Sequence, residues 1–245
     1  VPLALAPEVD CRRLLDATPK HLLERGPKPN PFAPWDSCLA VAAAGADHMV
    51  ILNKFPVQLG HLLLITRTYA NQSAPLEPQD CVQALNLLRD CPGLLFFNSG
   101  PAAGASQPHR HLQLLPLASR PYCCPWSGRF LEAAHSGRTM AGWDWPHVIL
   151  PLPPDRNGAD LLLYRCYQEG LEILGLRPSP QGLLPPHNLM AGDGWFLMVP
   201  RRQEVHQGIS INALGFCGLF LLTERGNRAW LERRGVLPLL GAVAC

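Results

Sequence analysis

Neither of the two common glycine-rich phosphate motifs occurs in this 245-residue sequence: there is no GxxxxGK(S/T) loop and no GxGxxG fingerprint. Both motifs hold phosphate against backbone N–H groups at the start of a helix. Their absence excludes the P-loop NTPases and the Rossmann-type dinucleotide enzymes. The segment GASQP (104–108) also lacks the closing glycine of a GxSxG nucleophile elbow, which argues against an α/β-hydrolase.

Charge is scarce as well. Charged residues make up 16% of the chain, the net charge is +2, and the only lysines are Lys20, Lys28 and Lys54. So small a positive balance does not predict a nucleic-acid or anionic-membrane surface. The longest apolar stretch, residues 213–222, contains two glycines and is too short to cross a bilayer. We therefore expect a cytoplasmic protein, monomeric or weakly oligomeric, with no nucleic-acid and no membrane partner.

The nine cysteines follow no repeated spacing. No CxxC pair occurs, and Cys123 and Cys124 are adjacent, which is a poor geometry for a structural disulfide. This pattern favours reduced thiols in a cytosolic protein. The chain begins with valine instead of methionine, so we expect a truncated or processed N-terminus.

The hydrophobic pattern predicts short strands that alternate with single helices. Strands are expected at residues 47–53, 61–67, 94–98, 109–117 and 147–152, and a hairpin is expected over 190–199, turning at Asp193-Gly194. Helices are expected at 76–89, 159–174 and 212–233, with a weak helical signal at 11–24 and an irregular stretch at 118–146. This order lacks a βαβαβ rhythm, so we expect an α+β fold with an antiparallel sheet flanked by helices. We expect one compact catalytic domain over residues 1–245. Each half of it contains a strand pair and a helix, a pattern that favours a diverged repeat.

The segment NSGPAAGASQPHRHLQ (98–113) concentrates polar groups on one strand. Residues two apart share a strand face, so His109, His111 and Gln113 point one way. Arg110 and every second residue after it point the other way. The preceding loop of small residues lets backbone N–H groups approach an anion, and the hydroxyls of Ser99 and Ser106 add donors. A neutral imidazole is a good nucleophile near pH 7. The segment therefore indicates phosphoryl chemistry on a histidine.

Two less specific interpretations compete with this one. An isolated HxH is more often a core pair or a metal-ligand pair than a nucleophile. A metal site needs a third ligand, and the other histidines that could supply it stand in no recognised zinc spacing. These are His61, His135, His147, His187 and His206. We expect no protein-bound metal.

The HRHLQ segment, with its HxHxQ spacing, resembles the active-site strand of the transferase branch of the histidine-triad superfamily. That branch includes hexose-1-phosphate uridylyltransferases and diadenosine tetraphosphate (Ap4A) phosphorylases, which are ATP adenylyltransferases. Further stretches are similar to the phosphorylases and follow in the same order: NPFAPWD (30–36), LNKFPVQLGHLLLITR (52–67), WFLMVPR (195–201) and GISINALGF (208–216). The resemblance implies a histidine-triad-like (uridylyltransferase-like) sheet.

The resemblance also implies a role for each matching residue. His111 would attack the α-phosphorus and hold AMP covalently, Gln113 would hydrogen-bond the transferred phosphoryl group, and His109 would orient the nucleophile. Lys54 would neutralise charge that builds on the polyphosphate. The nucleotide would be held from two sides, by Asn98 with Gly104, Ala105, Ser106 and Gln107, and by Asn212, Ala213 and Leu214 at the start of the last helix.

The implied reaction is phosphorolysis: Ap4A and inorganic phosphate give ATP and ADP. Magnesium (Mg2+) would accompany the polyphosphate, with no organic cofactor. Family members usually carry a longer segment before NPF, and residues 118–146 match little, so the preferred chain length of the substrate stays open. The alternatives are a hydrolase, disfavoured by Gln113 in place of a third histidine, a uridylyltransferase, disfavoured by the absence of HPH, and a non-catalytic nucleotide or metal sensor.

Overall fold

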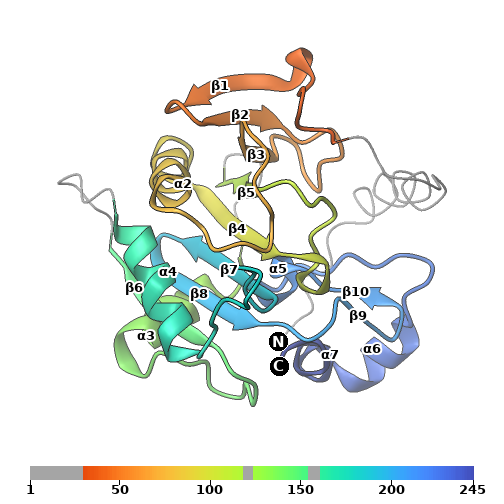
Figure 1. Cartoon of the computed structure of the whole chain (residues 1–245). Coiled ribbons are helices and arrows are strands. Elements are labelled where there is room, and N and C mark those ends of the chain that lie inside the picture. The colour runs from red at the N-terminus through yellow and green to blue at the C-terminus, as the bar shows by residue number, and fades with distance from the viewer. Residues whose placement is uncertain (1–29, 118–123, 154–160) are drawn as a thin grey trace.

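A computed structural model describes residues 30–117, 124–153 and 161–245, and it is built on one eight-stranded antiparallel sheet (Figure 1). The strand order is β1-β2-β3-β5-β4-β7-β8-β6. The strands are β1 (Ala40–Ala44), β2 (His48–Leu52), β3 (Leu62–Thr66), β4 (Gly93–Ser99), β5 (His111–Pro116), β6 (Val148–Leu152), β7 (His187–Gly192) and β8 (Gly194–Pro200). A separate two-stranded ribbon pairs β9 (Val205–His206) with β10 (Ile209–Ser210). The predicted α+β class and antiparallel sheet are confirmed.

Helices cover both faces of the sheet. On one face α2 (Pro78–Asp90) packs on β4 and α4 (Leu162–Ile173) packs on β6 and β8. The two helices also pack on each other, around a core that includes Leu64, Phe97 and Tyr167. On the opposite face α3 (Ser127–Ser136) and α5 (Ala213–Phe216) contact the sheet, and α7 (Val236–Val243) completes the second core. Phe96 belongs to this second core and Phe97 to the first, because successive side chains of a strand point to opposite faces.

Most elements predicted from the hydrophobic pattern lie close to their expected ranges. The strands expected at 47–53, 61–67, 94–98 and 147–152 are observed within one residue at each end, and the hairpin turns at Asp193 as expected. The helices expected at 76–89 and 159–174 correspond to α2 and α4. The weak helical signal at 11–24 lies outside the described residues.

Three expectations were wrong. The helix expected over 212–233 is two helices, α5 and α6 (Arg228–Arg234), because Gly218 adopts a left-handed conformation (φ +85°) that ends the helical path. The stretch expected to be irregular contains α3, and residues 118–123 within it lie outside the described range. The strand expected from residue 109 starts at His111, and His109 forms only an isolated bridge with Asn71.

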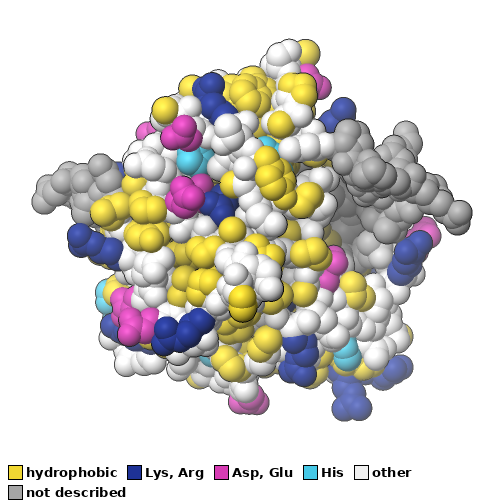
Figure 2. All heavy atoms as spheres, in the orientation of Figure 1, with side chains coloured by type: hydrophobic (Ala, Val, Ile, Leu, Met, Phe, Trp, Pro, Cys, Tyr) yellow, Lys and Arg dark blue, Asp and Glu magenta, His cyan; other side chains and the backbone are white. Residues whose placement is uncertain are grey.

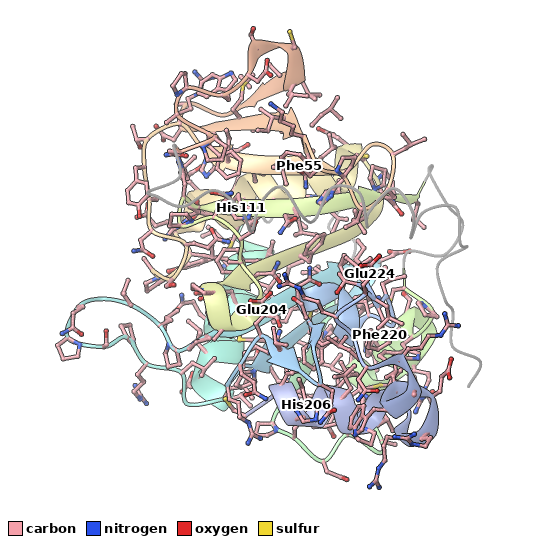
Figure 3. All side chains as sticks on the ribbon, turned by 90° about the vertical axis from the view of Figure 1, so that its right-hand side faces the viewer. Phe55, His111, Glu204, His206, Phe220 and Glu224 are labelled. Atoms are coloured by element: carbon pink, nitrogen blue, oxygen red, sulfur yellow. The ribbon has the colours of Figure 1, made fainter. Side chains whose placement is uncertain are left out.

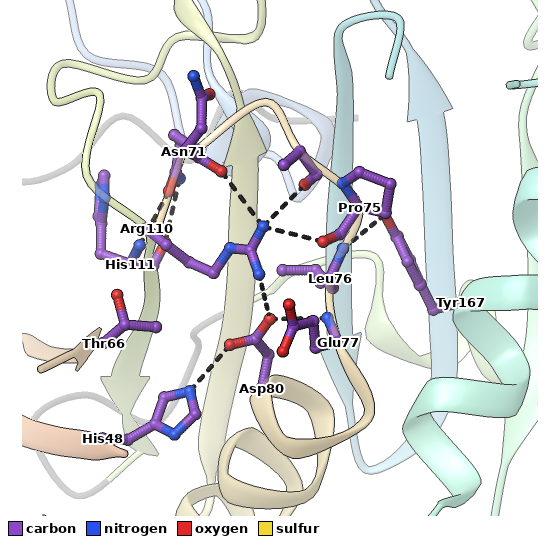
Figure 4. A network of polar contacts seen from close by, with 12 residues as sticks. His48, Thr66, Asn71, Pro75, Leu76, Glu77, Asp80, Arg110, His111 and Tyr167 are labelled. Carbon is purple, nitrogen blue, oxygen red and sulfur yellow. Dashed lines mark hydrogen bonds and ion pairs between the residues drawn. The ribbon is translucent and has the colours of Figure 1, made fainter. Parts of the chain in front are cut away.

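A buried ion-pair network joins α2 to the sheet (Figure 4). The guanidinium of Arg110 donates to Asp80 (2.7 Å), and the other oxygen of Asp80 lies 2.8 Å from Nε2 of His48. Arg110 also donates to the carbonyls of Asn71 and Pro75, and the Asp80 carboxylate accepts the Glu77 N–H at the start of α2. Burial raises the pKa of Asp80, but the hydrogen bond to His48 and the charge of Arg110 outweigh it and hold that pKa below its ordinary value. The network therefore fixes the residue next to His111 from the far face of the sheet.

The visible surface mixes side-chain types. On the face shown in Figure 2, basic and acidic side chains are both scattered and apolar side chains lie between them. Within residues 30–117, 124–153 and 161–245, none of the helices has the length and apolar character needed to cross a membrane.

Candidate active site

His111 is buried at the start of β5 as a neutral imidazole with one nitrogen held. Its Nδ1–H donates to the carbonyl oxygen of His109 (2.8 Å), which assigns the lone pair to Nε2. Burial lowers the pKa of His111 to about 4, so the ring is uncharged near neutral pH. In the view of Figure 3, His111 lies between Phe55 of the β2–β3 connection and Glu204, which precedes β9. A buried, neutral imidazole with a defined basic nitrogen is equipped for nucleophilic attack.

His109 supports His111 through its backbone and its position. Its Nε2–H donates to the Thr66 carbonyl (2.8 Å), and its Nδ1 accepts from Nδ2 of Asn30 (2.8 Å). Both ring nitrogens are thus engaged, and burial lowers the pKa of His109. Phe32 packs on both imidazoles, with ring centroids 5.6 Å from His109 and 5.3 Å from His111. The NPF stretch therefore forms one wall around the histidine pair.

Gln113 shares the face of His111 and is oriented by His61, which the sequence alone offers only as a candidate metal ligand. Nε2 of His61 donates to Oε1 of Gln113 (3.0 Å), while Nδ1 of His61 accepts from the amide of Asn53 (3.1 Å). Burial lowers the pKa of His61 to about 4. Because the Gln113 oxygen is engaged, its amide nitrogen is left to donate to a phosphoryl oxygen. The pairing register of β3 and β5 brings His61 here, and the sequence pattern does not reveal that register.

Lys54 is exposed on the connection between β2 and β3. Its chain neighbour Asn53 holds His61, so the lysine extends from the segment that orients Gln113.

The loop after β4 and the start of α5 lie against each other. Gly104 has φ +88°, and a Cβ on it would lie 2.7 Å from the Cβ of Asn212, so only glycine permits this approach. Ala105 and Gln107 are half-buried, and Ser106 is exposed.

The polar groups in this region are partly engaged within the protein. The side-chain oxygen of Asn98 accepts from Asn188 (2.8 Å) and from the Ala213 N–H (2.9 Å). The Asn212 side chain caps the Leu214 N–H (3.0 Å), and Ala213 and Leu214 are buried. The first two N–H groups of α5 are therefore occupied within the protein. They are not available for the nucleotide contact expected at this helix start. Ser99 lies on the other face of the sheet, buried beside its strand partner His187.

Arg201 and Asn188 were not predicted as site residues, yet their hydrogen bonds hold this region in place. The guanidinium of Arg201 is buried, donates to the carbonyl of Ile211 (2.7 Å) and to the Asn188 side chain, and lies over the Phe216 ring (5.3 Å). Burial lowers the pKa of Arg201 to about 10, so it stays charged at neutral pH. Within the part of the chain that the structure describes, no three histidine, cysteine or acidic side chains gather as metal ligands.

The antiparallel sheet carries His111 and Gln113 on one face of β5, as the HxHxQ spacing predicted. Residues 11–125 match the profile of the Ap4A phosphorylase N-terminal domain, and residues 141–245 match that of the ATP adenylyltransferase C-terminal domain. The chain therefore belongs to the Ap4A phosphorylase family.

Related proteins from yeast agree with this assignment. Protein APA1 of Saccharomyces cerevisiae is 33% identical over 202 residues, which cover 72% of this chain and 63% of APA1. Diadenosine tetraphosphate phosphorylase 2 of the same yeast is 30% identical over 227 residues, which cover 80% of this chain and 69% of that protein.

The fold is similar to solved structures of the yeast Ap4A phosphorylase Apa2. The complex with AMP superposes with a TM-score of 0.69 at 28% identity, covering 89% of this chain and 80% of that one. The complex with Ap4A gives 0.65 at 26% identity, covering 87% and 78%. The chain thus spans about two thirds to four fifths of the relatives that it matches.

Proposed function

We propose that this protein cleaves Ap4A with inorganic phosphate to ATP and ADP, through AMP bound covalently to His111. The observation that carries the proposal is the state of His111: its Nδ1–H is bound by the His109 carbonyl, and its pKa is lowered to about 4. Nε2 is therefore available as a nucleophile at neutral pH. The Apa2 structures that this fold resembles were solved with AMP and with Ap4A.

The reaction proceeds in two displacements at the same phosphorus. Nε2 of His111 attacks an α-phosphorus of Ap4A, the P–N bond forms, and the bond to the bridging oxygen breaks, releasing ATP. An oxygen of inorganic phosphate then attacks the adenylyl phosphorus, the P–N bond breaks, and ADP leaves. The substrates and the products both contain five phosphorus atoms, and His111 returns to its starting form.

Two other side chains stabilise the charge that develops. The amide nitrogen of Gln113, whose oxygen is held by His61, donates to a non-bridging oxygen of the phosphorus under attack. Lys54 neutralises the leaving triphosphate, and the substrate is the magnesium complex of the polyphosphate. Gln113 has no basic group with which to activate water, which favours phosphate over water as the second nucleophile.

Trapping the intermediate tests this proposal. When the protein is mixed with Ap4A and magnesium without phosphate, we expect a mass gain of one AMP on the peptide that contains His111. The adduct should be labile to acid and should disappear, with release of ADP, when phosphate is added. An unmodified peptide under conditions in which Ap4A is consumed would contradict the covalent route.

The pKa of His111 predicts a flat rate profile over the range in which an ordinary histidine titrates. Because the pKa in the folded state is about 4, the neutral nucleophile persists as pH falls through 6.5, and the rate should drop only near pH 4. The folded state loses stability over the same window, since the unfolded chain takes up protons there first. Single-turnover rates after a pH jump, with folding followed by circular dichroism, separate the two effects. A rate that halves near pH 6.5 in folded protein would contradict the assigned pKa.

Lys54→Ala should lower turnover more than it lowers ground-state binding. Removing one charge that acts in the transition state typically costs about 10²–10³-fold in kcat. We expect the Kd for Ap4A, measured in the presence of magnesium, to change far less than kcat. Lys54→Arg retains the charge and serves as the matched control, recovering part of the rate. A variant with weakened binding and normal kcat would contradict the role in the transition state.

A further inference from the structure

The two central strands of the sheet separate at the catalytic histidine. β4 and β5 pair from Gly93↔Pro116 to Phe96↔Gln113, and the ladder ends there. Beyond this point β4 continues beside β7, where Asn98 pairs with Asn188. His111 thus starts its strand where its regular neighbour on one side is missing. A backbone in such a position needs another hydrogen-bond partner.

The side chain of Gln72 occupies that position. Its Oε1 accepts the backbone N–H of His111 (2.8 Å), and its Nε2 donates to the carbonyls of Asn98 (2.9 Å) and His111 (3.1 Å). Gln72 is buried, with 1% of its surface exposed. One amide thus replaces the missing ladder on both strands, making both bonds that a strand neighbour would make to His111.

The segment that carries Gln72 is itself held against the histidine motif. The Gln72 N–H donates to the Pro108 carbonyl (2.8 Å), and the Arg110 N–H donates to the Ala70 carbonyl (2.8 Å). Asn71 and His109 form the antiparallel bridge between these bonds. The guanidinium of Arg110 also binds the Asn71 carbonyl (3.2 Å). Gln72 therefore enters the gap between β4 and β5 from a backbone that is hydrogen-bonded to the segment just before β5.

We infer that Gln72 is a positioning residue for the nucleotidyl transfer, an inference that rests on the proposed function of His111. The direction of Nε2 depends on the backbone between His109 and His111, because the carbonyl of His109 holds Nδ1 of His111. Gln72 fixes that backbone while keeping β5 apart from β4. A side chain in its place needs one acceptor and two donors, which only an amide supplies.

Gln72→Met tests the inference, since methionine keeps a similar length and loses every hydrogen bond. The single-turnover rate of His111 adenylylation should fall by about 10²-fold, as expected for a misaligned nucleophile, while the Kd for AMP changes by less than about threefold. Hydrogen exchange of the His111 amide should accelerate, whereas amides of β7 and β8 keep their protection. Gln79→Met, on the exposed start of α2, is the matched control and should match the wild type.

A normal adenylylation rate in folded Gln72→Met protein would overturn the inference, as would parallel losses of rate and AMP affinity. If the methionine variant does not fold, Gln72→Glu replaces it. Protonation of the buried carboxyl restores one donor. The adenylylation rate of Gln72→Glu relative to the wild type should therefore rise as pH falls, and a constant ratio would overturn the inference.

If the wild type itself forms no adduct, the proposed function fails. Hydrogen exchange of the His111 amide then tests the role of Gln72 independently of catalysis. Unchanged protection of that amide in Gln72→Met would overturn the positioning role.

Discussion

His111→Ala is expected to lower turnover of Ap4A by a factor on the order of 10⁵ to 10⁶, the size seen when an enzyme loses its nucleophile. The substitution removes the only nitrogen that forms a covalent bond in the proposed reaction. The AMP adduct should disappear completely under the conditions that trap it in the wild type. Turnover is measured by separating the nucleotides chromatographically, and the adduct by mass spectrometry of the peptide.

Binding should survive this change. The loop after β4, which the resemblance implies in nucleotide binding, and Lys54 both remain in His111→Ala. We expect the Kd for AMP to stay within about threefold of the wild type, since the imidazole acts in the transition state. His135→Ala, at an exposed position on α3, is the control and should be fully active. An adduct that persists in His111→Ala would place the nucleophile elsewhere.

Arg110→Met is expected to have the largest effect on stability. It leaves the carboxylate of Asp80, which is 3% exposed, without the guanidinium that lies 2.7 Å away. Removing one partner of a buried ion pair typically costs about 3–5 kcal/mol, because the other charge stays desolvated. The free energy of unfolding is measured by urea denaturation, and the loss should appear as a lower midpoint.

An exposed pair on the same protein provides the comparison. Arg138 and Glu169 lie 2.6 Å apart, with side chains about half exposed. Glu169→Gln should change the free energy of unfolding by about 1 kcal/mol or less, because solvent screens the pair. Equal effects of Arg110→Met and Glu169→Gln would contradict the structural importance assigned to the buried network.

The sequence was sufficient to predict the sheet strands near the site because they are strongly apolar and bounded by turns. Leu62–Thr66 and Gly93–Ser99 are examples, and both are observed within one residue of their predicted ends. The face shared by His111 and Gln113 followed from strand alternation alone. Arg110 pointed to the opposite face for the same reason, and the structure places it against Asp80 of α2.

What the sequence did not reveal depends on contacts between distant segments. His61 was noted only as a candidate metal ligand, since its approach to Gln113 requires the register of β3 on β5. Gln72 lies in a polar connection that has no periodicity, and its importance appears only where β4 and β5 separate. One long final helix was predicted over 212–233, but the left-handed Gly218 interrupts it.

Product analysis tests the central claim most directly. The protein is incubated with Ap4A and magnesium, with and without inorganic phosphate, and the nucleotides are separated by ion exchange. Phosphorolysis through His111 predicts ATP and ADP in equal amounts and only when phosphate is present. ATP and AMP formed at the same rate with or without phosphate would contradict it and identify a hydrolase.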